Sequence, residues 1–194
     1  MRDGFHTVAC LDEVGRGALA GPVTIGAVVL TSTTSPAPRN VRDSKLLSDR
    51  QRRALVPEVQ KWACHWSVGH ADAGEVDAVG ITEALGLAAR RALSSMPLVD
   101  AVLLDGPFDF ISRSAGPLDT YVVFPRVRAD LTCAGVAAAS ILAKVARDDV
   151  MLTLSKAFPQ YGFDQHKGYG SEAHREAILR HGSCEAHRKS FKLA

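Results

Sequence analysis

The chain has 194 residues, of which 46% are hydrophobic and 23% are charged. These values are ordinary for a globular protein of one domain with a buried core. No apolar run approaches the length of a membrane span and the first six residues lack a signal-peptide core, so we expect a cytoplasmic protein with no membrane partner. The four cysteines are widely spaced and form no C-x-x-C motif: Cys10, Cys64, Cys133 and Cys184. Disulfides are therefore not expected, which fits a reducing compartment.

The net charge of +2 hides an asymmetry along the chain. From His166 to Ala194 there are six Lys or Arg residues against three Glu, whereas the remaining 165 residues hold 17 basic residues against 18 acidic ones. Four of the seven histidines also lie in this tail. A solvated surface helix with a frayed end explains the excess, and so does a basic patch for a polyanion.

Periodicity and turn residues predict elements of both kinds along the chain. Short runs of Val and Leu between polar, Gly and Pro residues predict buried strands at 8–11, 23–30, 101–104 and 121–124. The first two are expected to pair antiparallel, and residues 31–39 form an exposed loop. Ser48 and Gln51 make a capping box that starts a helix, which Pro57 should kink or end. A further strand is expected at 62–68, where Trp62 and Trp66 should be core or half-buried.

The second half of the sequence is predicted to be mostly helical. Residues 71–93 have helical character and are broken near Gly80. The most regular helix spans 136–157, and its Ala137-Ala138-Ala139 run permits close approach to a sheet. Residues 162–171 should form a glycine-rich loop, after which Ser171 caps a final helix that ends at about Arg180.

Four acidic residues stand where apolar runs stop: Asp12, Glu13, Asp105 and Asp130. If the strands before them are neighbours in one sheet, the carboxylates converge at the edge where open α/β sheets bind ligands. Converging carboxylates repel each other, so a cation must neutralise them or a proton must be taken up. Oxygen ligands suit Mg²⁺ or Mn²⁺. The same four residues would also be unremarkable as helix caps, turn residues and surface ion pairs.

A polar stripe recurs every four residues on the 136–157 helix, at Ser140, Lys144 and Asp148. It begins about two helical turns after Asp130 and could line the same cleft. An ordinary solvated face with a Lys–Asp pair four residues apart gives the same pattern.

Two further motifs have weak support. Gly15-x-Gly17-x-x-Ala20 resembles a loose dinucleotide-binding fingerprint, but a strand rather than the required helix is predicted to follow it. His181-x-x-Cys184-x-x-His187 has metal-like spacing without a clear fourth ligand for structural zinc.

Several motifs taken together resemble those of the ribonuclease HII (type 2 ribonuclease H) family, in the family's order and over nearly the whole chain. They are Asp12-Glu13-Val14-Gly15-Arg16-Gly17 with Leu19–Pro22, Asp43-Ser44-Lys45, Leu104-Asp105-Gly106, Ala137–Val145 with Arg147-Asp148, Tyr161-Gly162-Phe163, His166–Gly170 and His187–Phe191. Two features depart from the family pattern. Ala18 stands at a usual proline, and the segment 106–129 is longer than is typical.

The resemblance implies a ribonuclease H-like α/β fold with a mixed five-stranded sheet flanked by helices. It implies a catalytic domain at 1–157 and a C-terminal helical extension at 158–194 that packs on it and contacts substrate. The implied activity is an endonuclease that hydrolyses the RNA strand of RNA–DNA hybrids and cleaves at ribonucleotides embedded in duplex DNA. A two-metal-ion mechanism with Mg²⁺ or Mn²⁺ would leave 3′-hydroxyl and 5′-phosphate ends, and we expect a monomer.

The resemblance also assigns roles to individual residues. Asp12, Glu13, Asp105 and Asp130 carry over as the catalytic, metal-binding set. The residues that read the ribose 2′-OH are Gly15, Arg16, Gly17 and Tyr169, and those that hold phosphates are Lys45, Lys144, His166 and Lys167. The rival interpretations are a catalytically silent hybrid-binding module and a nicotinamide-dependent enzyme.

Overall fold

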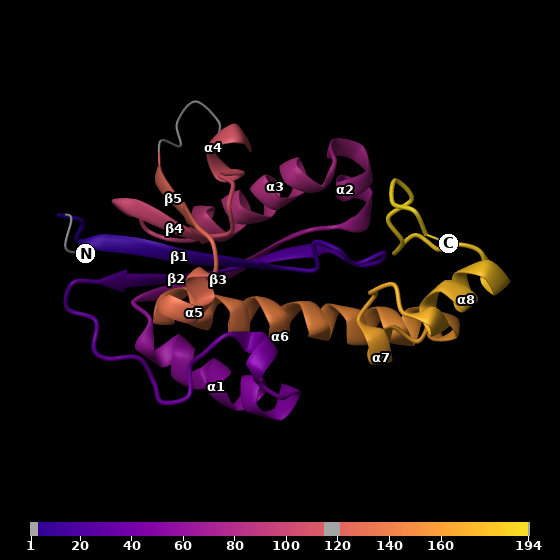
Figure 1. Ribbon diagram of the computed structural model, residues 1–194, viewed down its shortest axis with the longest axis horizontal. Coiled ribbons are helices and arrows are strands. Elements are labelled where there is room, and N and C mark those ends of the chain that lie inside the picture. The colour runs from indigo at the N-terminus through magenta and orange to yellow at the C-terminus, as the bar shows by residue number, and fades with distance from the viewer. Residues whose placement is uncertain (1–3, 115–120, 194) are drawn as a thin grey trace.

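The computed structural model describes residues 4–114 and 121–193, which form a mixed five-stranded sheet with helices on both faces (Figure 1). The strands lie in the order β3-β2-β1-β4-β5. Their bounds are β1 Thr7–Val14, β2 Val23–Thr31, β3 His65–Ala71, β4 Ala101–Asp105 and β5 Val122–Arg126. The β1–β2 and β2–β3 pairs are antiparallel, whereas β1–β4 and β4–β5 are parallel. The predicted fold class is confirmed.

Helices cover both faces of the sheet. Those in the first half of the chain are η1 Ser44–Leu46, α1 Asp49–Trp62, α2 Ala73–Val79 and α3 Ile81–Ser94. Those in the second half are α4 Ile111–Ser114, α5 Ala129–Thr132, α6 Ala134–Ala157, η2 Pro159–Tyr161, α7 Phe163–His166 and α8 Glu172–His181. In Figure 1, α2, α3 and α4 lie above the sheet, and α1, α5 and α6 lie below it.

The sheet and α6 approach each other closely because small residues meet at their contact. A Cβ atom on Gly26 of β2 would lie 2.2 Å from the carbonyl oxygen of Ala139. Along β1 the side chains alternate between the two faces, as a pleated strand requires. Ala9 and Leu11 pack in the core beneath α3, whereas Cys10 packs with Val136 at the start of α6. Asp12 therefore faces α5 and α6.

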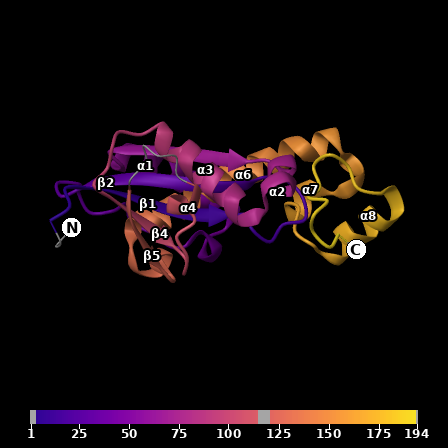
Figure 2. The same cartoon turned by 90° about the horizontal axis from the view of Figure 1, so that it is seen from above.

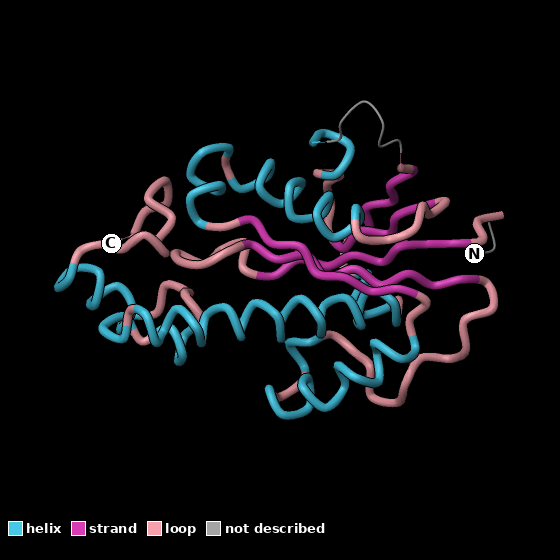
Figure 3. Tube along the Cα trace, turned by 180° about the vertical axis from the view of Figure 1, so that it is seen from behind, coloured by secondary structure: helices cyan, strands magenta, loops and turns pink. Residues whose placement is uncertain are grey.

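The C-terminal segment packs against the far end of α6 and the connection between β1 and β2, as Figures 2 and 3 show. A separate apolar cluster joins the two regions: Leu19, Ala20, Met151, Tyr161, Phe163, Ile178 and Ala186. Gly21 N–H donates to the Ala186 carbonyl, and Arg188 N–H donates to the Leu19 carbonyl, each at 2.8 Å. The loop after β1 thus folds onto the C-terminal segment.

Several sequence expectations hold at the helix ends. Ser48 and Gln51 form a capping box at α1, Gly80 separates α2 from α3, and Ser171 caps α8. Pro57 does not end α1, which continues to Trp62. Packing of α1 against α6 compensates for the one backbone hydrogen bond that the proline removes.

Four other expectations are corrected. The strand expected at 62–68 is β3, displaced to His65–Ala71, because α1 runs on through Trp62. Trp66 is 43% exposed and is not a core residue. The strand expected to be buried at 121–124 is β5, an edge strand whose side chains are mostly exposed. The glycine-rich loop contains the short helix α7, and part of the long 106–129 segment, residues 115–120, lies outside the described residues.

Candidate active site

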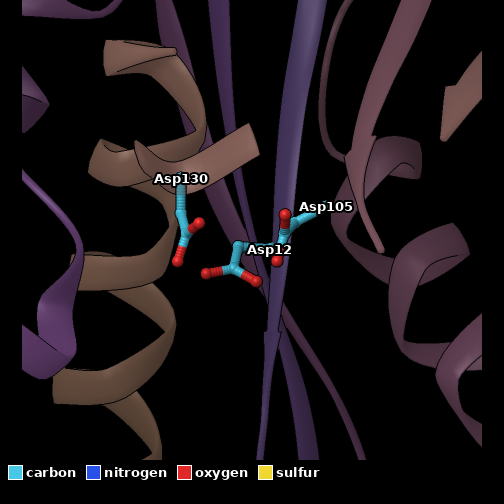
Figure 4. A group of neighbouring side chains, drawn as sticks. All are labelled: Asp12, Asp105 and Asp130. Atoms are coloured by element: carbon cyan, nitrogen blue, oxygen red, sulfur yellow. The ribbon is translucent and has the colours of Figure 1, made fainter. Parts of the chain in front are cut away.

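Three aspartates meet at one point beside the sheet. Asp12 lies on β1, Asp105 ends β4, and Asp130 lies in α5. Each offers a carboxylate oxygen within 4.8 Å of the others, and their carboxylates point toward one another in Figure 4. Asp12 and Asp130 are buried, at 5% and 6% exposed. Because β1 and β4 are parallel neighbours, their carboxylates reach the same region, as the sequence pattern predicts.

Backbone N–H groups orient two of these carboxylates. Asp105 Oδ1 accepts a 2.7 Å hydrogen bond from Ala129 N–H, which joins the end of β4 to the start of α5. Asp12 Oδ1 accepts a bond of the same length from Glu13 N–H. The residue before α5, Arg128, has φ 58°, a left-handed conformation that turns the chain sharply into the helix. This turn brings Asp130 back toward the sheet.

The electrostatics of the cluster favour a cation. Burial raises the pKa of Asp12 well above its usual value, and the nearby Asp105 and Glu13 carboxylates raise it further. Burial also raises the pKa of Asp130, with Asp105 adding to the effect. These shifts measure the cost of holding negative charge in a confined space. A divalent cation would remove that cost, and three carboxylate oxygens are the donor type that Mg²⁺ and Mn²⁺ prefer.

Glu13 lies beside the three aspartates, outside the group that meets within 4.8 Å. Its carboxylate is 3.8 Å from the Arg16 guanidinium. Burial raises the pKa of Glu13, with Arg16 opposing the shift. Glu13, Arg16 and Asp105 line one pocket of about 290 Å³, together with Phe108. The fourth acidic residue therefore faces a pocket next to the cluster.

Lys45, one of the predicted phosphate-binding residues, supplies a positive charge beside the carboxylate cluster. It lies in the η1 turn, with its Nζ 3.8 Å from Asp130 Oδ2 and its side chain 78% exposed. Burial would lower the pKa of Lys45, but the carboxylates of Asp43, Asp12 and Asp130 raise it. Asp43 caps the turn by accepting from Lys45 N–H at 2.9 Å. An exposed ammonium next to the carboxylates is well placed to meet an incoming anion.

The polar stripe on α6 has a structural role. Ser140 is buried and accepts from Ser44 N–H at 3.1 Å, which ties the η1 turn to α6. Lys144 Nζ donates to Asp148 Oδ1 at 2.7 Å, and Asp148 is 3% exposed. The ion pair four residues apart is present as predicted, but on a buried rather than a solvated face. The Lys144 ammonium thus uses one of its three N–H groups within the protein.

Gly15 and Gly17, which follow β1, differ in whether the structure has room for a side chain. Gly15 has φ 87°, and a Cβ atom there would lie 2.2 Å from Arg147 Nε, so this position needs glycine. Gly17 is outside the left-handed region, and a Cβ atom there would meet nothing within 4 Å. The loop is followed by β2 rather than a helix, which removes the basis for the dinucleotide-binding interpretation.

Two buried arginines hold this loop, and sequence reasoning assigned them no role. Arg147 of α6 donates to the carbonyls of Pro22, Lys167 and Ala20 at 2.9–3.0 Å. Arg188 donates to the carbonyls of Gly21 and Arg16 at 2.9–3.1 Å. Both arginines are 0% exposed. Both lie within the family-like motifs, but only the fold reveals that their partners are main-chain carbonyls.

Tyr169 lies against one of these arginines. Its ring is 38% exposed, and the Arg147 guanidinium carbon is 5.3 Å from the ring centroid. Arg147 thus contacts both the loop after β1 and Tyr169, which are separated by about 150 residues in sequence. The structure brings the four predicted 2′-OH readers, Gly15, Arg16, Gly17 and Tyr169, onto one scaffold.

The two residues before Gly168 make internal hydrogen bonds. Gly168 N–H donates to Nδ1 of His166, so Nε2 carries the proton and donates to the Tyr161 carbonyl at 2.8 Å. Lys167 Nζ donates to the Asp164 carbonyl. Lys167 still has two N–H groups for other acceptors, whereas His166 has none.

The histidines of the tail form a buried network. Cys184 N–H donates to His187 Nδ1, so His187 Nε2 carries the proton and donates to His174 Nε2 at 3.1 Å. His174 Nδ1 then donates to the Tyr169 carbonyl at 2.9 Å. Burial lowers the pKa of His174 to about 4 and also lowers that of His187. The network is neutral at pH 7.

The network also argues against a zinc site at His181, Cys184 and His187. His187 uses both ring nitrogens within the network, and His181 packs edge-on against Tyr161. Within residues 4–114 and 121–193, the one group of potential metal ligands is the aspartate cluster.

The fold and the carboxylate centre define a class of protein, the ribonuclease H-like nucleases. The family model described as Ribonuclease HII matches residues 9–194. The chain belongs to the ribonuclease HII family and is therefore a ribonuclease H, a metal-dependent endonuclease.

Individual relatives agree with this assignment. Ribonuclease HII of Vibrio vulnificus is 45% identical over 97% of this chain and 87% of its own length. That of Thermus thermophilus is 46% identical over 95% of this chain and 85% of its own. The crystal structure of ribonuclease H2 from Pyrococcus horikoshii superposes with a TM-score of 0.77 at 25% identity, over 97% of this chain and 95% of that one. Among the described residues, none of the helices is long and apolar enough to cross a membrane.

Proposed function

We propose that this ribonuclease hydrolyses the RNA strand of RNA–DNA hybrids and also cleaves at single ribonucleotides embedded in duplex DNA, leaving 3′-hydroxyl and 5′-phosphate ends. Family membership supports RNA-strand cleavage in hybrids. The single observation that carries the chemistry is the cluster of Asp12, Asp105 and Asp130 oxygens within 4.8 Å.

Asp12, Asp105 and Asp130 would hold two divalent ions, Mg²⁺ or Mn²⁺, with Glu13 as the fourth ligand. Such ions supply an activated water and neutralise the leaving oxygen of an in-line displacement. Asp105 is oriented for this task by Ala129 N–H, and Asp12 by Glu13 N–H. The raised pKa values of Asp12 and Asp130 support a cation-binding site, because a bound cation would offset the repulsion among the buried carboxylates.

The 2′-OH distinguishes RNA from DNA, and we infer that Gly15, Arg16 and Gly17 read it at close range. The open space at Gly17 supports this role, because a sugar could approach the backbone there. Tyr169 is half exposed beside the same loop and would stack on the sugar next to the ribonucleotide.

Lysine side chains would position the duplex through its phosphates without reading sequence. Lys45 lies beside Asp130 of the carboxylate cluster and Lys167 lies in the C-terminal segment, and each retains free N–H groups. Lys144 and His166 belong to the proposed set too. Lys144 keeps two N–H groups besides the one that it donates to Asp148, whereas a phosphate contact from His166 would require an internal hydrogen bond to open.

The proposed division into a catalytic domain at 1–157 and an extension at 158–194 follows from these roles, since the extension carries Tyr169 and Lys167. The chain would act as a monomer. Its nucleic-acid substrates are intracellular, and its four cysteines are free, so we propose a cytoplasmic location.

One assay tests the proposal. A duplex bearing a single ribonucleotide is incubated with the protein, with and without Mg²⁺, and the ends of the products are identified. We expect metal-dependent cleavage that leaves a 5′-phosphate. Binding without cleavage would favour a silent hybrid-binding module, and cleavage of an all-DNA duplex at the same rate would contradict 2′-OH recognition.

A further inference from the structure

Two cysteines lie side by side between the sheet and α6. The Sγ atoms of Cys10 and Cys133 are 4.0 Å apart, although the residues are 123 positions apart in sequence. Cys10 is 2% exposed, whereas Cys133 is half-buried. Closing a disulfide requires the sulfurs to approach to about 2.05 Å, a movement of roughly 2 Å. The other two thiols have other neighbours, since Cys64 contacts Thr34 and Cys184 contacts His187.

Cys133 lies where a thiolate is stabilised. It is the N-cap of α6, whose 24 residues begin at Ala134 and present unpaired N–H groups at this end. The hydrogen bond from the Cys10 thiol, followed by the N–H groups of Val136 and Gly135, lowers the pKa of Cys133 to about 6 against the effect of burial.

The Cys133 thiol can also be reached from outside. It lines a pocket of about 310 Å³ together with Asp43 and Asp130. A small oxidant entering this pocket would meet Cys133 first, with Cys10 behind it in the core. In a two-step oxidation, the accessible Cys133 thiol would therefore react first and the buried Cys10 thiol second.

We propose that Cys133 is a site of oxidation by hydrogen peroxide and that Cys10 is its resolving thiol. In the first step the Cys133 thiolate attacks one peroxide oxygen, the O–O bond breaks, and the departing hydroxide takes up a proton to leave as water. In the second step the Cys10 sulfur attacks the sulfenic sulfur, the S–S bond forms, and the S–O bond breaks as the hydroxyl leaves with the Cys10 proton as water. Two thiols are oxidised to one disulfide, and one peroxide is reduced to two waters.

The disulfide would bear on the carboxylate cluster. Cys10 precedes Asp12 by two residues on the same face of β1, and Cys133 follows Asp130 by three. Drawing the sulfurs together pulls the junction of α5 and α6 toward β1 and displaces Asp130 relative to Asp12. The oxidised protein should therefore cleave more slowly than the reduced protein, a consequence that rests on the proposed function.

The chemistry is tested first, without any activity assay. The variant Cys64→Ser/Cys184→Ser keeps only the proposed pair. It is treated with hydrogen peroxide, denatured in excess iodoacetamide and weighed intact. We expect a protein that has lost the mass of two hydrogen atoms and takes up no alkyl group, and that regains two alkylatable thiols after treatment with dithiothreitol.

Single substitutions in that background separate the two roles. With Cys10→Ala, Cys133 should gain oxygen atoms as sulfinic or sulfonic acid, because no resolving thiol remains. With Cys133→Ser, which keeps a good N-cap, Cys10 should stay reduced. The proposal is overturned if both thiols of the pair remain alkylatable under conditions that oxidise the exposed Cys64 of the wild-type chain.

Activity is measured afterwards on the same samples. The oxidised pair variant should lose at least about tenfold in rate and recover it with dithiothreitol. Unchanged activity in a protein shown by mass to hold the disulfide would refute the link to the carboxylate cluster, while leaving the oxidation site in place. Absence of activity in the reduced protein would instead contradict the proposed function.

Discussion

At the scale of single residues, Asp12, Asp105 and Asp130 show that gathering buried carboxylates at one point has a cost to the fold. Burial and mutual repulsion raise the pKa values of Asp12 and Asp130, so their charged forms weaken the metal-free protein. Lys45, at 3.8 Å from Asp130, is largely exposed and offsets only part of this repulsion. Binding of a cation to the cluster would stabilise the folded protein. Metal binding can therefore be measured by thermal unfolding as well as by the cleavage rate.

Asp12→Asn should therefore separate the two readouts. The variant should lose at least about a hundredfold in cleavage rate, about 2.7 kcal/mol of barrier. Without metal it should be more stable than wild type, and a gain of about 1 kcal/mol would raise Tm by about 2–4 °C. Adding Mg²⁺ should raise the Tm of wild type but not that of the variant. The exposed Glu58→Gln is the matched control, and near-normal turnover by Asp12→Asn would refute the metal-site assignment.

Gly15 and Gly17 give a second contrast between fold and function. Gly17→Ala should leave Tm within about 1 °C of wild type, because its methyl group meets nothing in the protein. Its cleavage at a ribonucleotide should fall by about tenfold or more, because the methyl group occupies space needed by the sugar. Gly15→Ala should instead lower stability by about 1–3 kcal/mol, because of its φ of 87° and its clash with Arg147. Thermal unfolding measures the stability of the two variants, and steady-state rates measure their cleavage. Full activity of Gly17→Ala would exclude a close approach of the sugar to the backbone at this residue.

At the scale of elements, the loop between β1 and β2 depends on side chains from the other end of the chain. Its carbonyls at Arg16, Ala20, Gly21 and Pro22 all accept from Arg147 or Arg188. Burial lowers the pKa of Arg188 to about 10, with the charge of Arg147 adding to the effect, yet both groups stay protonated at pH 7. Several backbone dipoles thus solvate each buried charge in place of water.

Arg188→Lys should show whether this geometry matters beyond the charge. An ammonium group cannot reach both Gly21 and Arg16 as the guanidinium does, so at least one buried carbonyl loses its partner. We expect a loss of about 1–3 kcal/mol in urea-induced unfolding. The exposed Arg180→Lys provides the control and should be near neutral. Equal stability of the two variants would mean that charge alone, rather than the forked geometry, holds the loop.

For the whole molecule, local patterns predicted most of the strands, the α6 helix and a convergence of four carboxylates, whereas the five-stranded sheet was implied by the family resemblance. Three of the four carboxylates meet within 4.8 Å, and Glu13 lies beside them. Each local pattern spans only a few residues. These patterns include the apolar runs of the strands, the helix-capping residues, and the positions of Asp12 and Asp105 after apolar stretches. The edge position of β5 and the burial of Arg147 depend on which segments become neighbours, which periodicity does not encode. The tail histidines show the difference most clearly, since charge counting left open a solvated surface helix and a basic patch, whereas the fold buries His174 and His187.

That buried network makes the stability of the whole protein depend on pH. Burial lowers the pKa of His174 to about 4 in the folded protein, whereas an unfolded histidine titrates near 6.5. Between these values the unfolded chain binds a proton that the folded chain excludes, so stability falls as pH drops from 6.5 toward 4 and is unaffected by this group above 6.5. The loss approaches about 3 kcal/mol, since each unit of pKa difference is worth about 1.36 kcal/mol. The positive charge of Arg175 acts in the same direction.

Urea unfolding between pH 4.5 and 7.5 would measure this dependence. The side chain of His174→Asn keeps a donor for the Tyr169 carbonyl but cannot titrate, so the variant should show a shallower fall in stability with acid than wild type. The slope that remains should come mainly from His187, whose pKa is also lowered by burial. His65→Asn, at an exposed position on β3, should leave the slope unchanged. If His174→Asn loses stability with acid as steeply as wild type does, the histidine network is not the source of the pH dependence, and carboxylates elsewhere would have to account for it.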